Sequence, residues 1–284
     1  MVPLAWLTLR RLPILALLAA VGSLVAGASA AAPHAGRQTS FAPRIASDST
    51  VSTNWSGYAV TTPAAASSTP VSFTDVAGTW VQPRVKCSGE VGAAAFWVGL
   101  GGWDQASQAL EQIGTEATCN ARRQVTYSAW YELVPAGPVT IKLKIRPKDH
   151  VTAAVLASGT QITLSLKNLT RHTRFTKRIG SSSALDTGSA EWIAEAPSLC
   201  SSRGRCTVVP LSNFGTVTFT GAATIGNGHP GTISDPTWFP AQVVLAADPN
   251  ASSGVGSAAN THGATPSSAS ADGRSFAVTW RQTG

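Results

Sequence analysis

The sequence has 284 residues, with 21 Lys and Arg against 14 Asp and Glu, a formal net charge of +7 and 43% hydrophobic residues. The positive charge is modest, and its densest segment, 167–178, almost lacks the aromatic side chains that stack on bases, so we expect no nucleic-acid partner. Because few carboxylates have to stay ionised in the fold, we expect tolerance of low pH.

Residues 1–30 have the pattern of an export signal. Arg10 and Arg11 precede the apolar stretch 12–26, and small residues at 28–30 have the spacing that signal peptidase requires. The apolar stretch is too short and too weakly flanked for a membrane span, and no other segment is long and apolar enough to cross a bilayer. We therefore expect a secreted, extracellular protein without membrane association after signal removal, exported by the general or the twin-arginine route.

Residues 31–50 are Ala-rich, polar and without periodicity, which predicts a propeptide or a disordered arm. From residue 51 to residue 284, short runs rich in Val, Thr, Trp, Tyr and Ile alternate with Gly, Pro and Ser clusters, as in an all-β sandwich or barrel. The Ser, Ala and Gly-rich segment 250–273 predicts a long loop, and 275–280 predicts one more strand. We expect a single domain over 51–284.

The basic segment 167–178 fits a solvated β-hairpin better than a binding patch. Apolar residues alternate with polar ones on both sides of an expected turn at 168–172. These apolar residues are Ile162, Leu164, Leu166, Phe175 and Ile179.

Four cysteines, an even number in an exported protein, favour two disulfides. Three pairings are possible, and the sequence-local one joins Cys87 to Cys119 and Cys200 to Cys206. No Cys-x-x-Cys or His-x-x-x-His spacing supports zinc, so we expect no metal site.

Two predicted strands, 127–132 and 189–195, place carboxylates beside tryptophan. Alternate side chains of a strand share a face, so Glu132 lies on the face of Trp130. In the second strand, Glu191 lies on one face and Trp192 on the other. Such acids usually belong to a solvated sheet face, so parity narrows the candidates without identifying chemistry.

A third stretch, 110–116, predicts one more polar face. If it is extended, Leu110, Gln112, Gly114 and Glu116 point the same way. The stretch therefore adds an amide and an acid to the candidates.

Other catalytic schemes fit the sequence poorly. There is no Gly-x-Ser-x-Gly elbow for a serine hydrolase, and the five histidines lie in polar or turn-like settings. Only one Asp-Thr-Gly turn occurs, at 186–188, whereas an aspartic peptidase needs two carboxylates that share a proton. No phosphate-binding loop is present, so we expect no cofactor.

Five strings of residues occur in the order found in one peptidase family. The sequence resembles the glutamic peptidases, or eqolisins, of the secreted bacterial type. The resemblance implies an antiparallel β-sandwich of two sheets with concanavalin or legume-lectin-like architecture, and an acid-active endopeptidase for polypeptide substrates that needs no metal or cofactor. The strings are Asn-Trp-Ser-Gly-Tyr at 54–58, Phe-Trp-Val-Gly-Leu at 96–100, Gln-Ile-Gly-Thr at 112–115, Tyr-Ser-Ala-Trp-Tyr-Glu at 127–132 and Ala-Glu-Trp-Ile at 190–193.

The resemblance assigns the family's catalytic glutamine to Gln112 and its catalytic glutamate to Glu191. The chemistry suits these residue types. A carboxylate at Glu191 takes a proton from a bound water and returns it to the leaving amine. The amide of Gln112 holds that water and donates to the developing oxyanion.

Supporting roles follow for the acids and tryptophans near these strings. Glu132 and Glu116 match acidic positions near the family's site. Trp55 and Trp130 are expected to form walls for substrate side chains and to raise the pKa of the catalytic glutamate. For Trp80 and Trp97, ordinary core packing is the alternative.

Departures from the family pattern leave part of the site open. Gly101-Gly102 stands where many relatives have Asp-Gly, so an acidic contact is missing there, and Ser128 replaces an acid seen in some relatives. A lectin-like carbohydrate-binding module remains an alternative, as does a glycoside hydrolase with Glu132 and Glu191 as paired carboxylates. We expect a monomer.

Overall fold

The computed structural model describes residues 37–38, 44–46, 49–64, 68–104, 107–181, 185–200, 206–246 and 262–282. All of them belong to one compact unit, Ala35–Gly284. The expected signal segment 1–30, most of 31–50 and most of the expected loop 250–273 lie outside the described residues. Among the described residues, no helix has the length and apolar character needed to cross a membrane.

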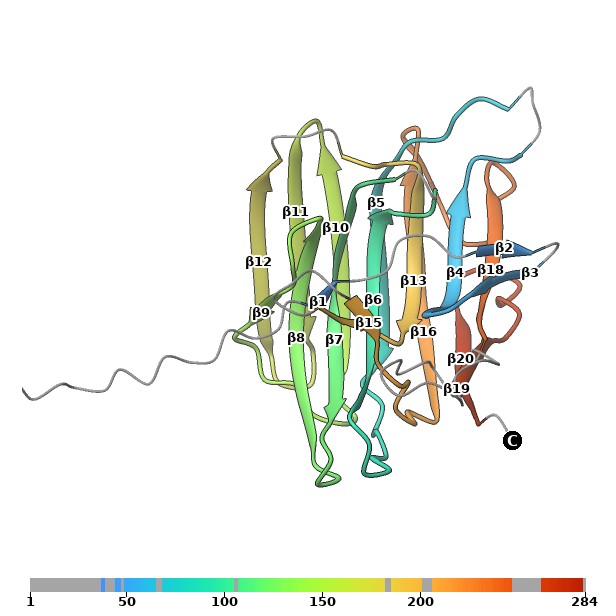
Figure 1. Ribbon diagram of the computed structural model, residues 1–284. Helices are drawn as coiled ribbons and strands as arrows, with labels where there is room; N and C mark the ends of the chain where they lie inside the picture. Colours follow the sequence, from blue (N-terminus) through green and yellow to red (C-terminus); the bar gives the residue numbers. More distant parts are fainter. Residues whose placement is uncertain are drawn as a thin grey trace, which may run out of the picture. The chain divides into compact units, whose positions relative to one another are not determined.

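Fourteen of the described strands pair side by side in one continuous ladder (Figure 1). Their order is β12 (Thr173–Gly180), β11 (Gln161–Asn168), β10 (His150–Ser158), β5 (Phe73–Val81), β16 (Thr216–Gly226), β20 (Phe276–Gln282), β19 (His262–Pro266), β18 (Phe239–Leu245), β4 (Trp55–Thr61), β13 (Ser189–Glu195), β6 (Gly92–Gly101), β7 (Leu110–Cys119), β8 (Val125–Val134) and β9 (Val139–Ile141).

Six short strands complete the described set. β17 (His229–Gly231) pairs with β16, and β2 (Arg44–Ala46) pairs with β3 (Ser49–Ser52). β3 runs parallel to β18, whereas the other paired strands are antiparallel. β1 (Arg37–Gln38), β14 (Ser198–Cys200) and β15 (Cys206–Val208) form a separate sheet.

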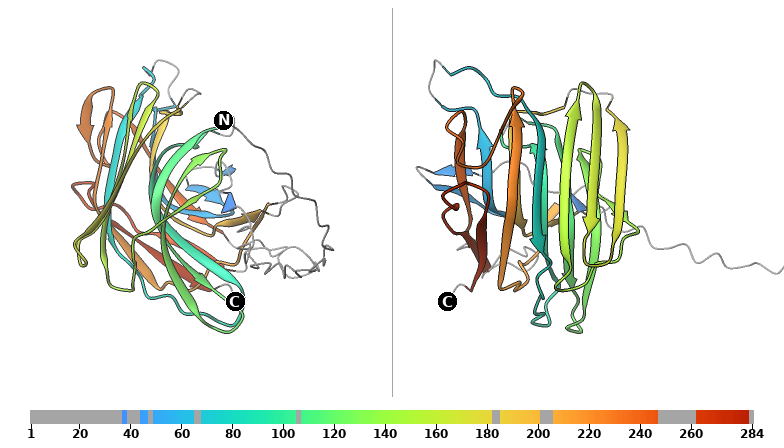
Figure 2. Two further views of the ribbon diagram at one scale, coloured as in Figure 1. Left: turned by 90° about the vertical axis from the view of Figure 1, so that its left-hand side faces the viewer. Right: turned by 180° about the vertical axis from the view of Figure 1, so that it is seen from behind.

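The ladder folds over so that its two halves face each other, as Figure 2 shows in its left view. β7 packs across from β10 and β11, and β13 packs across from β5. The turn between the halves is the short contact of β18 with β19, where Leu245 pairs with Ala264. The prediction of an all-β antiparallel fold is confirmed. Strand pairing is continuous between the halves, so the expected division into two separate sheets with legume-lectin character remains an expectation.

Alternating apolar residues explain why the facing strands form. In β10, Val151, Ala153 and Val155 are buried, and in β11 Ile162 and Leu164 are buried, while the residues between them are partly or fully exposed. β11 ends at residue 168 and β12 begins at 173, which confirms the predicted hairpin. The inward side chains join one core cluster between the halves.

The strand β13 is buried along its whole length because both of its faces are covered. On one face Trp192 enters the core between the two halves. On the other face Ile193 packs in a second cluster with Trp55, Trp97 and Trp130. The second cluster lies on the side of the layer that faces away from the main core.

A disulfide joins Cys87, which precedes β6, to Cys119 at the end of β7, with Cα atoms 5.5 Å apart. This confirms one of the two predicted bridges. The side chains of Cys200 and Cys206 lie outside the described residues, although their backbones pair directly between β14 and β15. The second bridge therefore stays a prediction.

Two described segments differ from the expected irregular structure. β19 lies inside the segment 250–273, where small residues predicted a loop, because its backbone pairs with β20. β1 and β2 lie inside the segment 31–50. In both places, pairing with a neighbouring strand overrides weak local propensity.

Candidate active site

Strand pairing brings four sequence positions into one row across the second layer. Glu191 of β13 pairs with Gly99 of β6, Gly99 pairs with Gln112 of β7, and Gln112 pairs with Glu132 of β8. Paired residues of neighbouring strands project to the same face of a sheet. Gln112 and Glu191, which are 79 positions apart in the chain, therefore share one face, and Glu132 lies beside Gln112.

Gly99 lies between the two candidate catalytic residues in the row, and its neighbours leave no room for a side chain there. A Cβ atom there would lie 2.9 Å from the Trp97 ring and 3.2 Å from the Gln112 Cβ. Two strand spacings separate the backbones of Gln112 and Glu191 by about 9.5 Å. Glycine is therefore the residue that this position requires, because any side chain would collide with Trp97 and Gln112.

Gln112 is held by its neighbour in the row. Its Nε2 donates a hydrogen bond of 2.8 Å to Oε2 of Glu132, and both side chains are fully buried. Because the donor is an amide and the acceptor a carboxylate, this bond fixes the orientation of the amide. Glu132 thus contacts the candidate glutamine directly, as the supporting role requires.

Glu191 is fully buried, and neither of its carboxylate oxygens makes a hydrogen bond of standard geometry within the described residues. Burial raises its pKa well above the ordinary value. The Ser189 hydroxyl offsets part of this effect, whereas the negative charges of Asp186 and Glu111 add to it. No cation of the described part of the chain is among the groups that shift the pKa of Glu191, and a buried carboxyl group in such an environment keeps its proton.

Trp97 and Trp130 lie in the next row on the same face, two residues along each strand from the row of Gln112 and Glu191. They flank Gly114 on three neighbouring strands, and the Trp55 ring meets Trp97 edge to face at 5.1 Å between centroids. Trp55 and Trp130 thus lie on the same face as Gln112 and Glu191, and their expected role as walls for substrate side chains stays a prediction. Trp97 belongs to the same cluster, so it is not part of the main core.

Glu195 holds the tryptophan cluster in place, a role that was not predicted from the sequence. Its carboxylate accepts 2.7 Å and 3.3 Å hydrogen bonds from Nε1 of Trp97 and Nδ2 of Asn54. The residues that could have indicated this role are the Asn-Trp string at 54–55 and Glu195, the second acid of β13. Only the strand register shows that they meet.

Glu116 lies farther from the dyad than expected. It is four residues along β7 from Gln112, about 13 Å at the usual rise of a strand. It accepts a 2.8 Å hydrogen bond from the Thr118 hydroxyl and pairs across the strands with Ser128. The structure therefore brings Glu132, but not Glu116, into contact with Gln112.

An acid occupies the place that the Gly101-Gly102 turn seemed to leave without one. Gly101 has φ +82°, and a Cβ atom there would lie 2.6 Å from the Cβ of Asp186. The Asp186 carboxylate accepts hydrogen bonds from the Gly102 amide at 2.9 Å, the Gly188 amide at 2.8 Å and the Ser107 hydroxyl. Asp186, from the single Asp-Thr-Gly turn, thus ties the end of β6 to the start of β13.

The geometry disfavours a glycosidase pair. Glu132 and Glu191 are three strand spacings apart, about 14 Å between backbones, with Gln112 between them. Paired glycosidase carboxyl groups are roughly 5 to 9.5 Å apart. The backbones of Gln112 and Glu191, two strand spacings apart, are closer to each other than those of the two acids.

Comparison with known proteins points to one family. The model of the Peptidase A4 family matches residues 53–254. Among curated proteins, no significant match is found.

Solved structures of peptidases are similar to this chain. Scytalido-glutamic peptidase, solved with a peptide-based transition-state analogue, is 25% identical with a TM-score of 0.60, over 80% of this chain and 98% of that one. SCP-B, a member of the eqolisin family solved with the tripeptide Ala-Ile-His, is 25% identical with a TM-score of 0.58 over the same shares. Aspergilloglutamic peptidase from Aspergillus niger is 26% identical over 66% of this chain and 98% of that one, with a TM-score of 0.48.

Proposed function

The chain belongs to the Peptidase A4 family of glutamic endopeptidases, and we propose that Gln112 and Glu191 form its catalytic dyad. The observation that supports this assignment most strongly is the shared row, in which only the side-chain-free Gly99 lies between them. In the proposed complex, the scissile peptide bond and a water molecule lie between the amide and the carboxyl group.

In the proposed reaction, Glu191 acts first as a base and then as an acid. Its carboxylate removes a proton from the water that attacks the scissile carbonyl carbon, and the carboxyl group then passes this proton to the leaving nitrogen. The C–N bond breaks as the new C–O bond completes the carboxyl product.

Gln112 supplies the polar partner of the reaction. Its amide donates to the oxygen that gains negative charge in the tetrahedral intermediate, a contribution of about 3 kcal/mol for a well-placed donor. The 2.8 Å hydrogen bond to Glu132 keeps the amide oriented before substrate arrives. Glu132 is a positioning residue in this scheme.

Access to the dyad requires movement, since Gln112 and Glu191 are fully buried. We propose that the segment 31–50 is a propeptide whose removal opens this face. In support, Gln38 of β1 pairs with Ser198, three residues beyond β13. Opening hydrates Glu191 and lowers its pKa toward the ordinary range, so its carboxylate form is available in acid.

The test is digestion of casein or haemoglobin by the purified protein at pH of about 3 to 4, where an unperturbed glutamate titrates. We expect peptide release after loss of the N-terminal segment, resistant to pepstatin, and no sugar release from polysaccharides. Absence of digestion at every pH after N-terminal removal would overturn the proposal, as would complete inhibition by pepstatin. N-terminal sequencing of the active form checks the propeptide boundary.

A further inference from the structure

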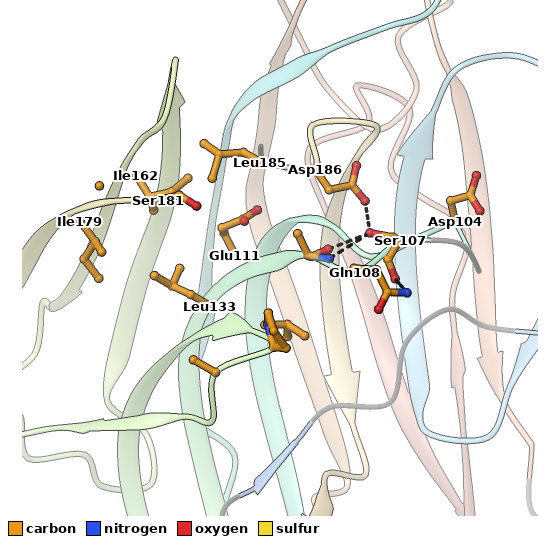
Figure 3. A pocket seen from close by; sticks show the side chains of 15 residues that line it. Asp104, Ser107, Gln108, Glu111, Leu133, Ile162, Ile179, Ser181, Leu185 and Asp186 are labelled. Atoms are coloured by element: carbon orange, nitrogen blue, oxygen red, sulfur yellow. Dashed lines mark hydrogen bonds between the residues drawn. The ribbon is translucent and has the colours of Figure 1, made fainter. Parts of the chain in front are cut away.

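A cavity of about 810 Å³ lies on the opposite face of β7 from Gln112, at the same end of the strand (Figure 3). Glu111, the residue before Gln112, lines it, because successive side chains of a strand point to opposite faces. The cavity touches the candidate active-site face at Val134, which lines the cavity and also packs in the cluster of Trp97 and Trp130. The cavity and the candidate dyad are therefore adjacent.

One side of this cavity is aliphatic, whereas Asp104, Ser107, Gln108 and Asp186 are among the polar residues that line it. Leu133 of β8, Ile162 of β11, Ile179 of β12 and Leu185 of the loop before β13 surround Glu111 in Figure 3. Such walls favour the methylene stem of a long side chain, which loses its contact with water there.

Three acids line the cavity, Asp104, Glu111 and Asp186, and the proposal depends on the last two. Glu111 is 4% exposed, and its Oε2 has no hydrogen-bond partner within the described residues. Asp186 lies across from it and is fixed by the bonds to Gly102, Gly188 and Ser107. None of the described residues that line the cavity is Lys, Arg or His. Burial, and then the charge of Asp186, raise the pKa of Glu111 to about 8.

We propose that this cavity binds the side chain of a lysine or arginine residue of a polypeptide substrate, with its stem against the aliphatic walls and its cationic head between Glu111 and Asp186. A lysine or arginine side chain has a long apolar stem and a positive end. The stem matches the aliphatic residues of the cavity, and the positive end matches the two acids. The assignment of the ligand as substrate rests on the proposed peptidase function. The cation site itself is independent of catalysis.

Binding is tested on the full chain by calorimetry at pH 7 with two probes, Nα-acetyl-lysine amide and Nα-acetyl-norleucine amide. The lysine probe should bind at least tenfold more tightly, because the norleucine probe lacks the ammonium group. The titratable groups that line the cavity are Asp104, Glu111 and Asp186. Since the ammonium group favours the ionised form of Glu111, lysine binding should release protons, detected as a buffer-dependent heat. Equal affinity for both probes, or no proton release, would overturn the site.

Variants locate the site. Glu111→Gln should weaken lysine binding at least tenfold and abolish proton release, whereas the exposed-acid control Glu90→Gln should change neither. Ile179→Lys places a built-in ammonium group in the cavity and should abolish binding of the added lysine probe. It also keeps the test decisive if Glu111→Gln does not fold. Unchanged lysine affinity in a folded Glu111→Gln or Ile179→Lys variant contradicts the proposal.

Peptide cleavage then tests whether the cavity binds a substrate side chain or only a free cation. Replacing the single lysine of a cleaved peptide by norleucine should lower kcat/KM about tenfold in the unaltered enzyme and by less than twofold in Glu111→Gln. If no peptide is cleaved but the lysine probe binds, the peptidase proposal fails and the cation site stands. If peptides are cleaved with equal kcat/KM for lysine and norleucine, the substrate assignment fails and the dyad stands.

Discussion

Asp149 and Glu191 are both buried carboxyl groups, but they lie in opposite electrostatic environments. Burial alone would raise the pKa of Asp149, yet hydrogen bonds from Arg171 and Asn168, at 2.8 Å and 2.7 Å, and the charge of Arg171 hold it below the usual range. Glu191 has no such partners, and its pKa is raised. Partners, and not burial alone, therefore distinguish an acid that stabilises the fold from one available for proton transfer.

The comparison predicts that Glu191→Gln loses activity without losing stability. We expect kcat/KM on a peptide substrate to fall at least about a thousandfold, because the amide cannot accept the water proton. The free energy of unfolding at pH 7 should not decrease, since a neutral amide replaces a buried acid. Kinetics at acid pH and urea unfolding check both, with Glu90→Gln as control. A Glu191→Gln variant that is less stable but still active would contradict both expectations.

Asp149→Ala should show the opposite pattern. Loss of charged hydrogen bonds to Arg171 and Asn168 is expected to lower the free energy of unfolding by about 2 to 3 kcal/mol, with kcat/KM unchanged well below the melting temperature. Because the folded pKa of Asp149 is lowered, its stabilisation is present above the unfolded pKa and is lost as pH falls through the folded pKa. Urea unfolding at pH 7 and pH 3 measures this. An equal deficit at both pH values would contradict the ion-pair account.

The last expected effect is a change in the pH dependence of stability in Glu111→Gln. Its pKa rises from 4.5 to about 8 on folding, so the native state keeps a proton that the unfolded chain releases in this window. The free energy of unfolding should therefore fall by about 1.4 kcal/mol for each pH unit between pH 5 and pH 8, and the variant should lack this contribution. Urea unfolding at four pH values tests it. Parallel curves for the two proteins would refute the raised pKa.

Local sequence patterns predicted the strands around the candidate site and which of their side chains share a face, but not the short strands β1, β2 and β19. Alternation around Trp130 and Trp192 predicted their strands and faces, and cysteine spacing predicted the bridge from Cys87 to Cys119. The family strings singled out Gln112 and Glu191, which the register then placed in one row.

The sequence patterns could not predict contacts between strands that are far apart in the chain. The register that aligns Gly99 with Glu191 depends on a pairing across 92 positions, and a one-residue slip would turn every side chain to the other face. The Glu195 bonds to Asn54 and Trp97, and the Asp186 carboxylate against Gly101, are likewise set by folding over long distances. No alternation pattern in one segment contains this information.

The most direct test of the dyad is a double-mutant cycle on Gln112→Ala and Glu191→Gln, with kcat/KM measured on one peptide at acid pH. Gln112→Ala alone should cost about a hundredfold to a thousandfold. If the two side chains act on one water and one carbonyl, the double variant should be no less active than Glu191→Gln within a few-fold, as for residues that act as a unit. Losses that multiply in the double variant would contradict a shared catalytic step.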